Sequence, residues 1–308
     1  LFSFKVSAVC NPIPEEQPVI NIFCIIFNPY KFLKWYYNFI NIKALWIKMT
    51  KKDMEIKTLL DIEVENRNKD FEISYDKPDP LLVARRYDDE FIILLCALFA
   101  YGNAKLIVKF LDSLDFSLLE KSDEIIDKEL NNHYYRFQNA QDIKTVFKTF
   151  KRLKNEDSLN SIFVNAYKKE NNILEGIDAL IQKIHNTANH TSQGFTFLIS
   201  SPFKRDKQGI IKELGNAPYK RWNMFLRWMV RDDNLDLGLW KGIEKKDLIL
   251  PLDTHTFKVS QKLGLLDRQS YDLKSALLIT NKLKEFDNLD PIKYDFSLYR
   301  IGQEKIEF

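Results

Sequence analysis

The chain has 308 residues, of which 45% are apolar and 29% are charged. This composition excludes a disordered or fibrous chain and is typical of a globular protein with one large core or two small ones. The formal net charge of +3 comes from the first 48 residues, so residues 49–308 carry equal numbers of basic and acidic side chains. Binding to nucleic acid would therefore need a local basic surface.

The first 48 residues differ from the rest of the chain, because they contain few acids and no initial Met. Their apolar stretch Val19–Phe27 is too short to cross a bilayer, and no small-residue cleavage site of a signal peptide follows it. We expect translation to begin at Met49 and residues 1–48 to be upstream translation or a disordered extension. The sequence predicts a cytoplasmic protein with no membrane partner.

Cysteine and histidine positions argue against metal chemistry. Outside the first 48 residues the only cysteine is Cys96, within the apolar run FIILLCALFA, where we expect a lone buried thiol. No two histidines have the spacing of a helical metal pair. We therefore expect no metal, no iron–sulfur cluster and no cofactor.

Apolar periodicity predicts helices along the chain and few strands, so we expect an all-α protein. The expected helices span residues 54–67, 88–101, 103–113, 122–132, 140–153, 157–170, 173–188, 218–231, 254–263, 270–286 and 291–301. Residues 189–217 form the longest stretch expected to be irregular. We expect an N-terminal helix within residues 49–75 and a single domain over residues 76–308.

The helix expected over residues 218–231 has two distinct faces when projected at 100° per residue. One face is apolar and the other largely basic; the first consists of Trp222, Phe225, Leu226 and Met229, and the second of Lys220, Met224, Arg227 and Arg231. The basic stripe is either a solvated face of a core helix or a surface that contacts phosphates or a substrate.

Two segments together resemble the helix-hairpin-helix DNA glycosylase superfamily, which includes endonuclease III. LGNAPYKRWN, residues 214–223, is similar to the hairpin L-P-G-V-G-[RK]-K-T-A-N, and PLDTHTFK is similar to the downstream V-D-T-H-x-x-R segment. The closing run KYDFSLYRIG resembles the last core helix of that superfamily. More closely, DPLLVARRY, KRWNMFLRWMVRDDNLDLGLW and DPIKYDF resemble an uncharacterised bacterial family of unknown function, and the resemblance covers about residues 76–308.

The resemblance implies a two-lobed, all-α glycosylase-like fold with a modified helix-hairpin-helix. It implies a base-excision glycosylase, with or without lyase activity, acting on DNA. Lys220 aligns with the catalytic lysine and Asp253 with the catalytic aspartate, which would stabilise positive charge at the sugar carbon. Further basic residues are candidates for phosphate contacts: Lys204, Arg205, Arg221, Arg227 and Arg231.

The sequence also departs from the glycosylase pattern. Asn216 and Pro218 replace two hairpin glycines, and the insertion 231–249 could reshape or cover the cleft. The cysteine-rich tail of endonuclease III is absent. Three aromatic residues are candidates for base stacking by type, although a core position is the ordinary interpretation: Tyr101, Trp228 and Trp240.

Several alternatives stay open at this level. Asp253 precedes an expected helix, so it is also a candidate helix N-cap, and His255 is expected to be a packed core histidine. The chain could be a non-catalytic nucleic-acid-binding or interaction module on the same fold. It could also be a related enzyme that acts on RNA or a nucleotide.

Overall fold

The structure, a computed structural model, describes residues 49–306, which belong to a compact unit running from Met49 to Phe308. The expectations for residues 1–48 lie outside the described residues. Within residues 49–306 the regular structure consists of thirteen α-helices and four short 3-10 helices, without strands. The expected all-α class is therefore confirmed for this part of the chain.

The α-helices follow one another along the chain as α2 (Lys51–Arg67), α3 (Leu81–Ala84), α4 (Glu90–Leu98), α5 (Ala104–Asp112), α6 (Asp123–Glu129), α7 (Ala140–Glu156), α8 (Leu159–Glu170), α9 (Ile173–Thr187), α10 (Gln193–Ile199), α11 (Lys220–Val230), α12 (Thr254–Lys262), α13 (Leu273–Phe286) and α14 (Asp295–Glu304). The 3-10 helices are η1 (Asp70–Glu72), η2 (Phe116–Glu120), η3 (Lys245–Asp247) and η4 (Pro291–Tyr294). Each expected helix overlaps an observed one, whereas the short helices α3 and α10 were not expected.

Polar side chains directly before the helices set many of the observed starting points. Asp89 Oδ1 accepts hydrogen bonds from the backbone of Phe91 and Ile92 at the start of α4. Thr50 and Asn139 form capping boxes at the starts of α2 and α7. Since an N-cap of this kind contributes about 1 kcal/mol, these residues explain why the helices begin where they do.

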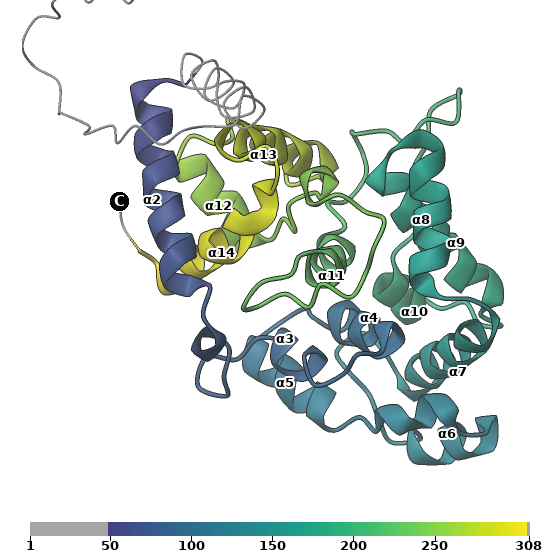
Figure 1. Ribbon diagram of the computed structural model, residues 1–308. Coiled ribbons are helices and arrows are strands. Elements are labelled where there is room, and N and C mark those ends of the chain that lie inside the picture. The colour runs from purple at the N-terminus through teal and green to yellow at the C-terminus, as the bar shows by residue number, and fades with distance from the viewer. Residues whose placement is uncertain (1–48, 307–308) are drawn as a thin grey trace, which may run out of the picture. The chain divides into compact units, whose positions relative to one another are not determined.

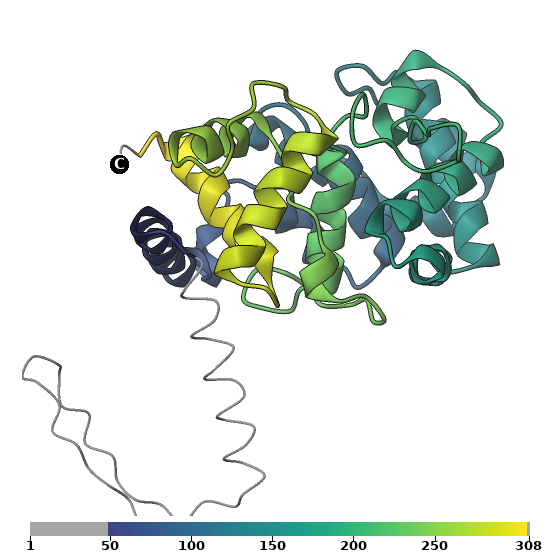
Figure 2. The same cartoon turned by 90° about the horizontal axis from the view of Figure 1, so that it is seen from above.

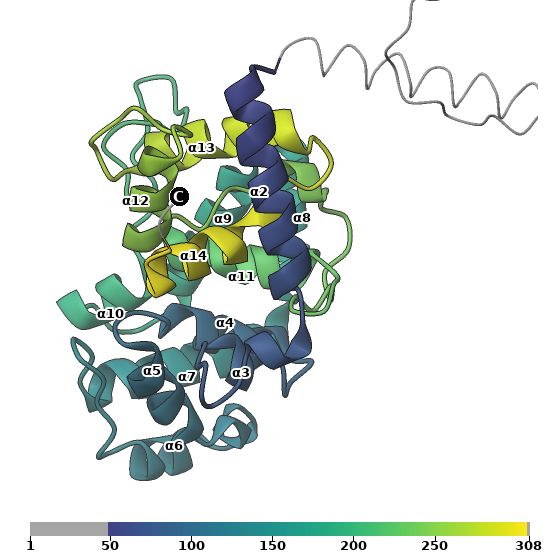
Figure 3. The same ribbon diagram turned by 90° about the vertical axis from the view of Figure 1, so that its left-hand side faces the viewer.

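The helices pack in two groups that share one hydrophobic cluster. Helix α9 contacts α7, α8 and α10, and α10 also contacts α7, whereas α14 contacts both α12 and α2. Between them α11 packs against α4, and Figure 1 shows α11 near the centre of the described helices. Figures 2 and 3 show α2 beside the C-terminal helices from two further directions. The core therefore runs through α11, which carries one of the two predicted catalytic residues.

Helix α11 is buried on both of its faces. The predicted apolar face is confirmed, because the side chains of Trp222, Phe225 and Leu226 are inaccessible to solvent. The expectation of a solvated basic face is wrong for Arg227 and Arg231, which are only 5% and 7% exposed. A helical projection distinguishes two faces, but it does not show what packs against the second one.

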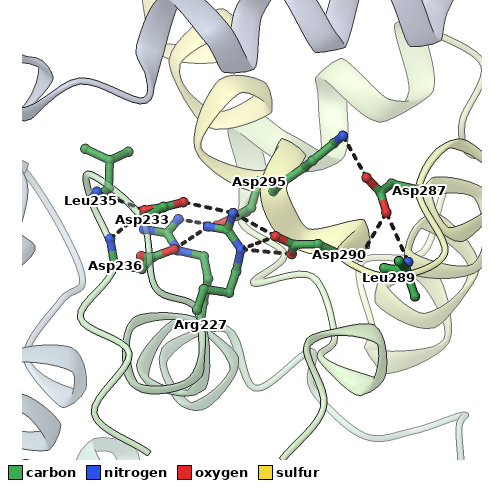
Figure 4. A network of polar contacts seen from close by, with 10 residues as sticks. Arg227, Asp233, Leu235, Asp236, Asp287, Leu289, Asp290 and Asp295 are labelled. Carbon is green, nitrogen blue, oxygen red and sulfur yellow. Dashed lines mark hydrogen bonds and ion pairs between the residues drawn. The ribbon is translucent and has the colours of Figure 1, made fainter. Parts of the chain in front are cut away.

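Arg227 is buried because two aspartates from other parts of the chain neutralise it. Its Nε donates to Asp236 Oδ1 at 3.1 Å, and its Nη1 donates to Asp295 Oδ2 at 2.6 Å. Figure 4 shows these carboxylates around the guanidinium. Asp236 lies in the loop after α11 and Asp295 begins α14, so this arginine joins three segments of the chain.

Arg231 extends the same network, which we call the buried ion-pair network. Its guanidinium donates to Asp290 at 2.9 Å, approaches Asp233 at 2.9 Å and bonds Asp236. Burial raises the pKa of Asp236, although both arginines oppose this shift. Because an unpaired charge in such surroundings costs several kcal/mol, each arginine depends on its carboxylates.

The segment before α11 is irregular rather than helical. Helix α10 ends at Ile199, and α11 begins only at Lys220. Gly209 and Gly215 adopt φ values of +84° and +81°, which a right-handed helix does not accommodate. The Asn216 side chain donates to the carbonyls of two residues of this loop and accepts from a third backbone group. Among the described residues, no helix therefore lies directly before the segment in which the hairpin was expected.

The described residues bear on three features discussed from composition, which are Cys96, membrane spans and metal-ligand clusters. Cys96 is fully buried, as expected. Among the described helices, none is both long and apolar enough to cross a membrane. Residues 49–306 also contain no cluster of three or more metal-ligating side chains.

Candidate active site

Lys220 and Asp253 line one cavity, which we call the central cavity. Its volume is about 500 Å³, within the size range of small-molecule sites. Its walls come from the loop between α4 and α5 and from α11, α12 and α14. The exposed residues Asn103 and His255 also line it, so the central cavity opens to solvent.

Lys220 is the first residue of α11, and the residue before it holds it in place. Tyr219 has φ 47°, in the left-handed region that non-glycine residues rarely adopt. Its ring stacks on Phe203 with centroids 3.8 Å apart, and its hydroxyl donates to the Ser201 carbonyl at 2.8 Å. The half-buried Lys220 side chain forms no hydrogen bond or ion pair with another described residue.

Asp253 is the N-cap of α12, as expected. Its Oδ1 accepts hydrogen bonds from the backbone N–H groups of His255 and Thr256, both at 2.8 Å. The other carboxylate oxygen of Asp253, Oδ2, accepts no hydrogen bond from any residue within 49–306. The cap and a role in the cavity are therefore compatible, because the two oxygens are available for different partners.

Another acid, Asp295, lines the same cavity and was not among the sequence candidates. It is 4% exposed, and burial raises its pKa to about 6 against the opposing effect of Arg227. The charge of Asp253 raises this pKa further, while Lys220 lowers it. The only sequence signal was its place within the KYDFSLYRIG run, inside the helix predicted over residues 291–301.

Two tyrosines and one histidine complete the surroundings of Asp253; Tyr271 is 42% exposed and Tyr299 is partly buried. Burial raises the pKa of Tyr271 and of Tyr299, and the nearby charge of Asp253 adds to both shifts. Tyr271 donates to the Leu252 carbonyl at 2.6 Å. The expectation that His255 is a packed core histidine is wrong: it lies in the first turn of α12 and is exposed at the cavity.

The five predicted phosphate-binding residues lie in different environments. Lys204 is exposed and forms no ion pair with a described residue, and Arg221 lines the central cavity. Arg205 is neutralised by Glu175 at 2.7 Å and Asp178 at 2.5 Å. Arg227 and Arg231 belong to the buried ion-pair network, and Arg227 also lines the central cavity.

The three aromatic candidates also lie in different environments. Trp240 is a core residue, because its Nε1 donates to Glu90 at 2.7 Å and its ring packs edge-on against Phe225. Trp228 is fully buried beside the central cavity, and its Nε1 has no partner among the described residues. Tyr101 lines the cavity and is half-buried.

The insertion 231–249 does not cover the site. None of residues 232–249 is among those that line the central cavity. Its aspartates and Trp240 instead support α11 from the interior. The insertion therefore stabilises the helix that carries Lys220 without closing the cavity.

Comparison with known families assigns the chain to a group without a described activity. Residues 79–304 match the family model described as "Protein of unknown function (DUF2400)". Because the match covers most of the chain, the protein belongs to the DUF2400 family. No curated protein and no solved structure matches the chain significantly.

Proposed function

We propose that this protein cleaves the N-glycosidic bond of damaged bases in DNA, with Lys220 as the nucleophile and Asp253 as the stabiliser of positive charge. The single observation that carries the proposal is that both side chains line one solvent-open cavity although they belong to different helical segments. An amine and a carboxylate around one small cavity are the two groups that this reaction requires.

The proposed step proceeds by displacement at the sugar. The neutral Lys220 amine attacks the anomeric carbon, the bond to the base breaks, and the base leaves with the bonding electrons and takes up a proton. The anomeric carbon carries positive charge in the transition state, which Asp253 stabilises through its unoccupied Oδ2. Opening of the sugar ring then gives an imine with Lys220, from which a lyase reaction can follow.

Asp295 supplies a proton acceptor for this step. The Lys220 amine must lose a proton before it can attack, and a carboxyl with a pKa of about 6 in the same cavity exchanges protons close to neutral pH. Its ion pair with Arg227 fixes its position. Asp295 thus adds a role that the two predicted residues do not fill.

The proposal extends to the fold and the partner. We take the two groups of helices on either side of α11 as the two lobes of a glycosylase-like fold, and DNA in the cytoplasm as the substrate. Lys204 and Arg221 are the phosphate contacts that this arrangement retains, because they lack carboxylate partners among residues 49–306.

Release of free base from oligonucleotides that each carry one damaged base tests the proposal. The natural sequence should release base from at least one lesion, while Lys220→Ala and Asp253→Asn should reduce the rate by about a hundredfold or more. Lys258→Ala is the matched control, because Lys258 is exposed on α12 and does not line the cavity. Equal rates for all four proteins would contradict the proposal.

A further inference from the structure

Three aromatic rings and two arginines cluster beside the central cavity, and we call them the aromatic–arginine platform; two of the five, Tyr101 and Arg221, line the cavity itself. Phe137 and Phe197 are 59% and 42% exposed, although both belong to a packed cluster. The Tyr101 ring lies nearly parallel to Phe137 at 6.2 Å and edge-on to Phe197 at 5.0 Å. Exposed phenylalanines held in fixed positions are unusual unless a partner covers them.

The two arginines of the platform are Arg136 and Arg221. The Arg221 guanidinium lies 5.2 Å from the ring centre of Tyr101 and 5.0 Å from that of Phe197. Arg136 lies 5.8 Å from the Tyr101 ring centre and 5.6 Å from that of Phe137. Such stacking orients each guanidinium plane but leaves its charge for another partner.

Neither arginine has a carboxylate partner in the part of the chain that the structure describes. Arg221 donates instead to the carbonyls of Leu98, at 2.6 Å, and Phe197. Burial lowers the pKa of Arg221 to about 10, so the side chain still carries its charge at neutral pH. Arg227, on the same helix, is by contrast neutralised by two aspartates. An uncompensated cation at a cavity rim favours an anionic ligand.

A groove of about 1090 Å³ leads from the platform along the irregular segment before α11. Its walls carry hydroxyl groups from Ser192, Thr196 and Ser201, together with the exposed amine of Lys204. The groove and the central cavity share Lys220 and Arg221 as lining residues. A chain lying in the groove would therefore reach the mouth of the cavity.

We infer that the groove and the aromatic–arginine platform bind an unpaired nucleic-acid strand, with bases stacked on Phe137 and Phe197 and phosphates on Arg221 and Lys204. Aromatic faces bind bases only when these are not stacked in a duplex, whereas cations and hydroxyls bind any backbone phosphate. The combination of both favours single-stranded nucleic acid over a duplex. The inference rests on the proposed function for the purpose of the cavity, but binding itself requires no chemistry.

Fluorescence anisotropy on the full chain tests this inference. The probes are a labelled oligothymidylate, a labelled oligouridylate of equal length, and a labelled mixed-sequence duplex. We expect at least one single strand to bind about tenfold more tightly than the duplex, and Phe137→Ala or Phe197→Ala to weaken that binding by about tenfold. The stronger of the two single strands identifies the natural backbone as DNA or RNA.

Phe71→Ala is the matched control, because Phe71 is 69% exposed and lines neither the groove nor the cavity. Circular dichroism establishes that each variant is folded. Equal or tighter binding of the duplex, or unchanged affinity of folded Phe137→Ala and Phe197→Ala, would overturn the inference. If strand binding behaves as expected but no base is released from any lesion, the proposed function fails while this inference stands.

Discussion

Asp253 shows how one side chain can serve both the fold and the site. Its Oδ1 holds two backbone N–H groups of α12, and its Oδ2 remains available at the central cavity. The helix therefore fixes the carboxylate in place while one oxygen stays free to act on a substrate. A substitution that keeps the cap but removes the charge separates the two roles.

We expect Asp253→Asn to keep the stability of the fold and to lose base release. Asparagine caps a helix about as well as aspartate, whereas Asp253→Ala should lower the free energy of unfolding by about 1 kcal/mol. Urea denaturation measures the stability of both variants, and the base-release assay measures the activity. Full activity in a stable Asp253→Asn variant would limit this residue to a structural role.

The raised pKa of Asp295 predicts a characteristic dependence of stability on pH. Because the folded-state pKa of about 6 exceeds the ordinary value of 3.8, the folded protein binds the proton more tightly than the unfolded chain. The contribution of Asp295 to stability is therefore fully present below pH 4 and is lost as the pH rises to about 6.

Urea denaturation at successive pH values, compared between the natural sequence and Asp295→Asn, isolates this contribution. The difference in unfolding free energy between the two proteins should fall between pH 4 and pH 6 and then stay constant. A difference that does not change with pH would show that Asp295 titrates normally.

Helix α11 depends on charges that lie outside it. The buried ion-pair network joins Arg227 and Arg231 to the loop after α11 and to the start of α14 (Figure 4). The same helix carries Lys220 at its first residue, so the network determines where the predicted nucleophile lies. Stability and activity should therefore respond together when the network is broken.

We expect Arg231→Met to lower the free energy of unfolding by about 3–5 kcal/mol, because it removes one of the two cations of the buried Asp236 and the cation of the partly buried Asp233 and Asp290. Lys183→Met is the control, since Lys183 forms an exposed ion pair with Glu156 at 2.8 Å, and exposed pairs contribute at most about 1 kcal/mol. Urea denaturation measures both. A loss as small as that of Lys183→Met would show that the network contributes little.

Across the whole molecule, much of the secondary structure was predictable and the burial of charges was not. Apolar periodicity located eleven helices, since it is a local property of the chain. It did not reveal that Arg227 and Arg231 are buried, because their partners Asp236, Asp290 and Asp295 lie in other segments. The irregular segment expected over residues 189–217 contains α10 as well.

The residues of the candidate site were also only partly predictable from the sequence. Lys220 and Asp253 were found because each belongs to a short recognisable motif, and the structure brings both to one cavity. The sequence did not identify Phe137 and Phe197 as site residues. Their ring centres lie 4.8 Å apart only because segments far apart in the chain pack together. Residues that act through tertiary contacts leave no local pattern in the sequence.

The neutral charge balance of residues 49–308 predicts how nucleic-acid binding responds to salt. Binding should depend on the local cations assigned to phosphates, which are Lys204 and Arg221. Two phosphate contacts on a single strand give a slope of about −1.4 for the logarithm of the association constant against the logarithm of the salt concentration. Anisotropy titrations at several salt concentrations measure it, and a slope near zero would exclude phosphate contacts.

Borohydride trapping is the most direct measurement of the central claim. When the protein reacts with an oligonucleotide carrying a damaged base, borohydride should reduce the imine to a stable amine, and peptide mapping should locate the adduct at Lys220. Lys220→Ala should give no adduct. Base release without any adduct, or an adduct at another lysine that persists in Lys220→Ala, would contradict the assignment of Lys220 as the nucleophile.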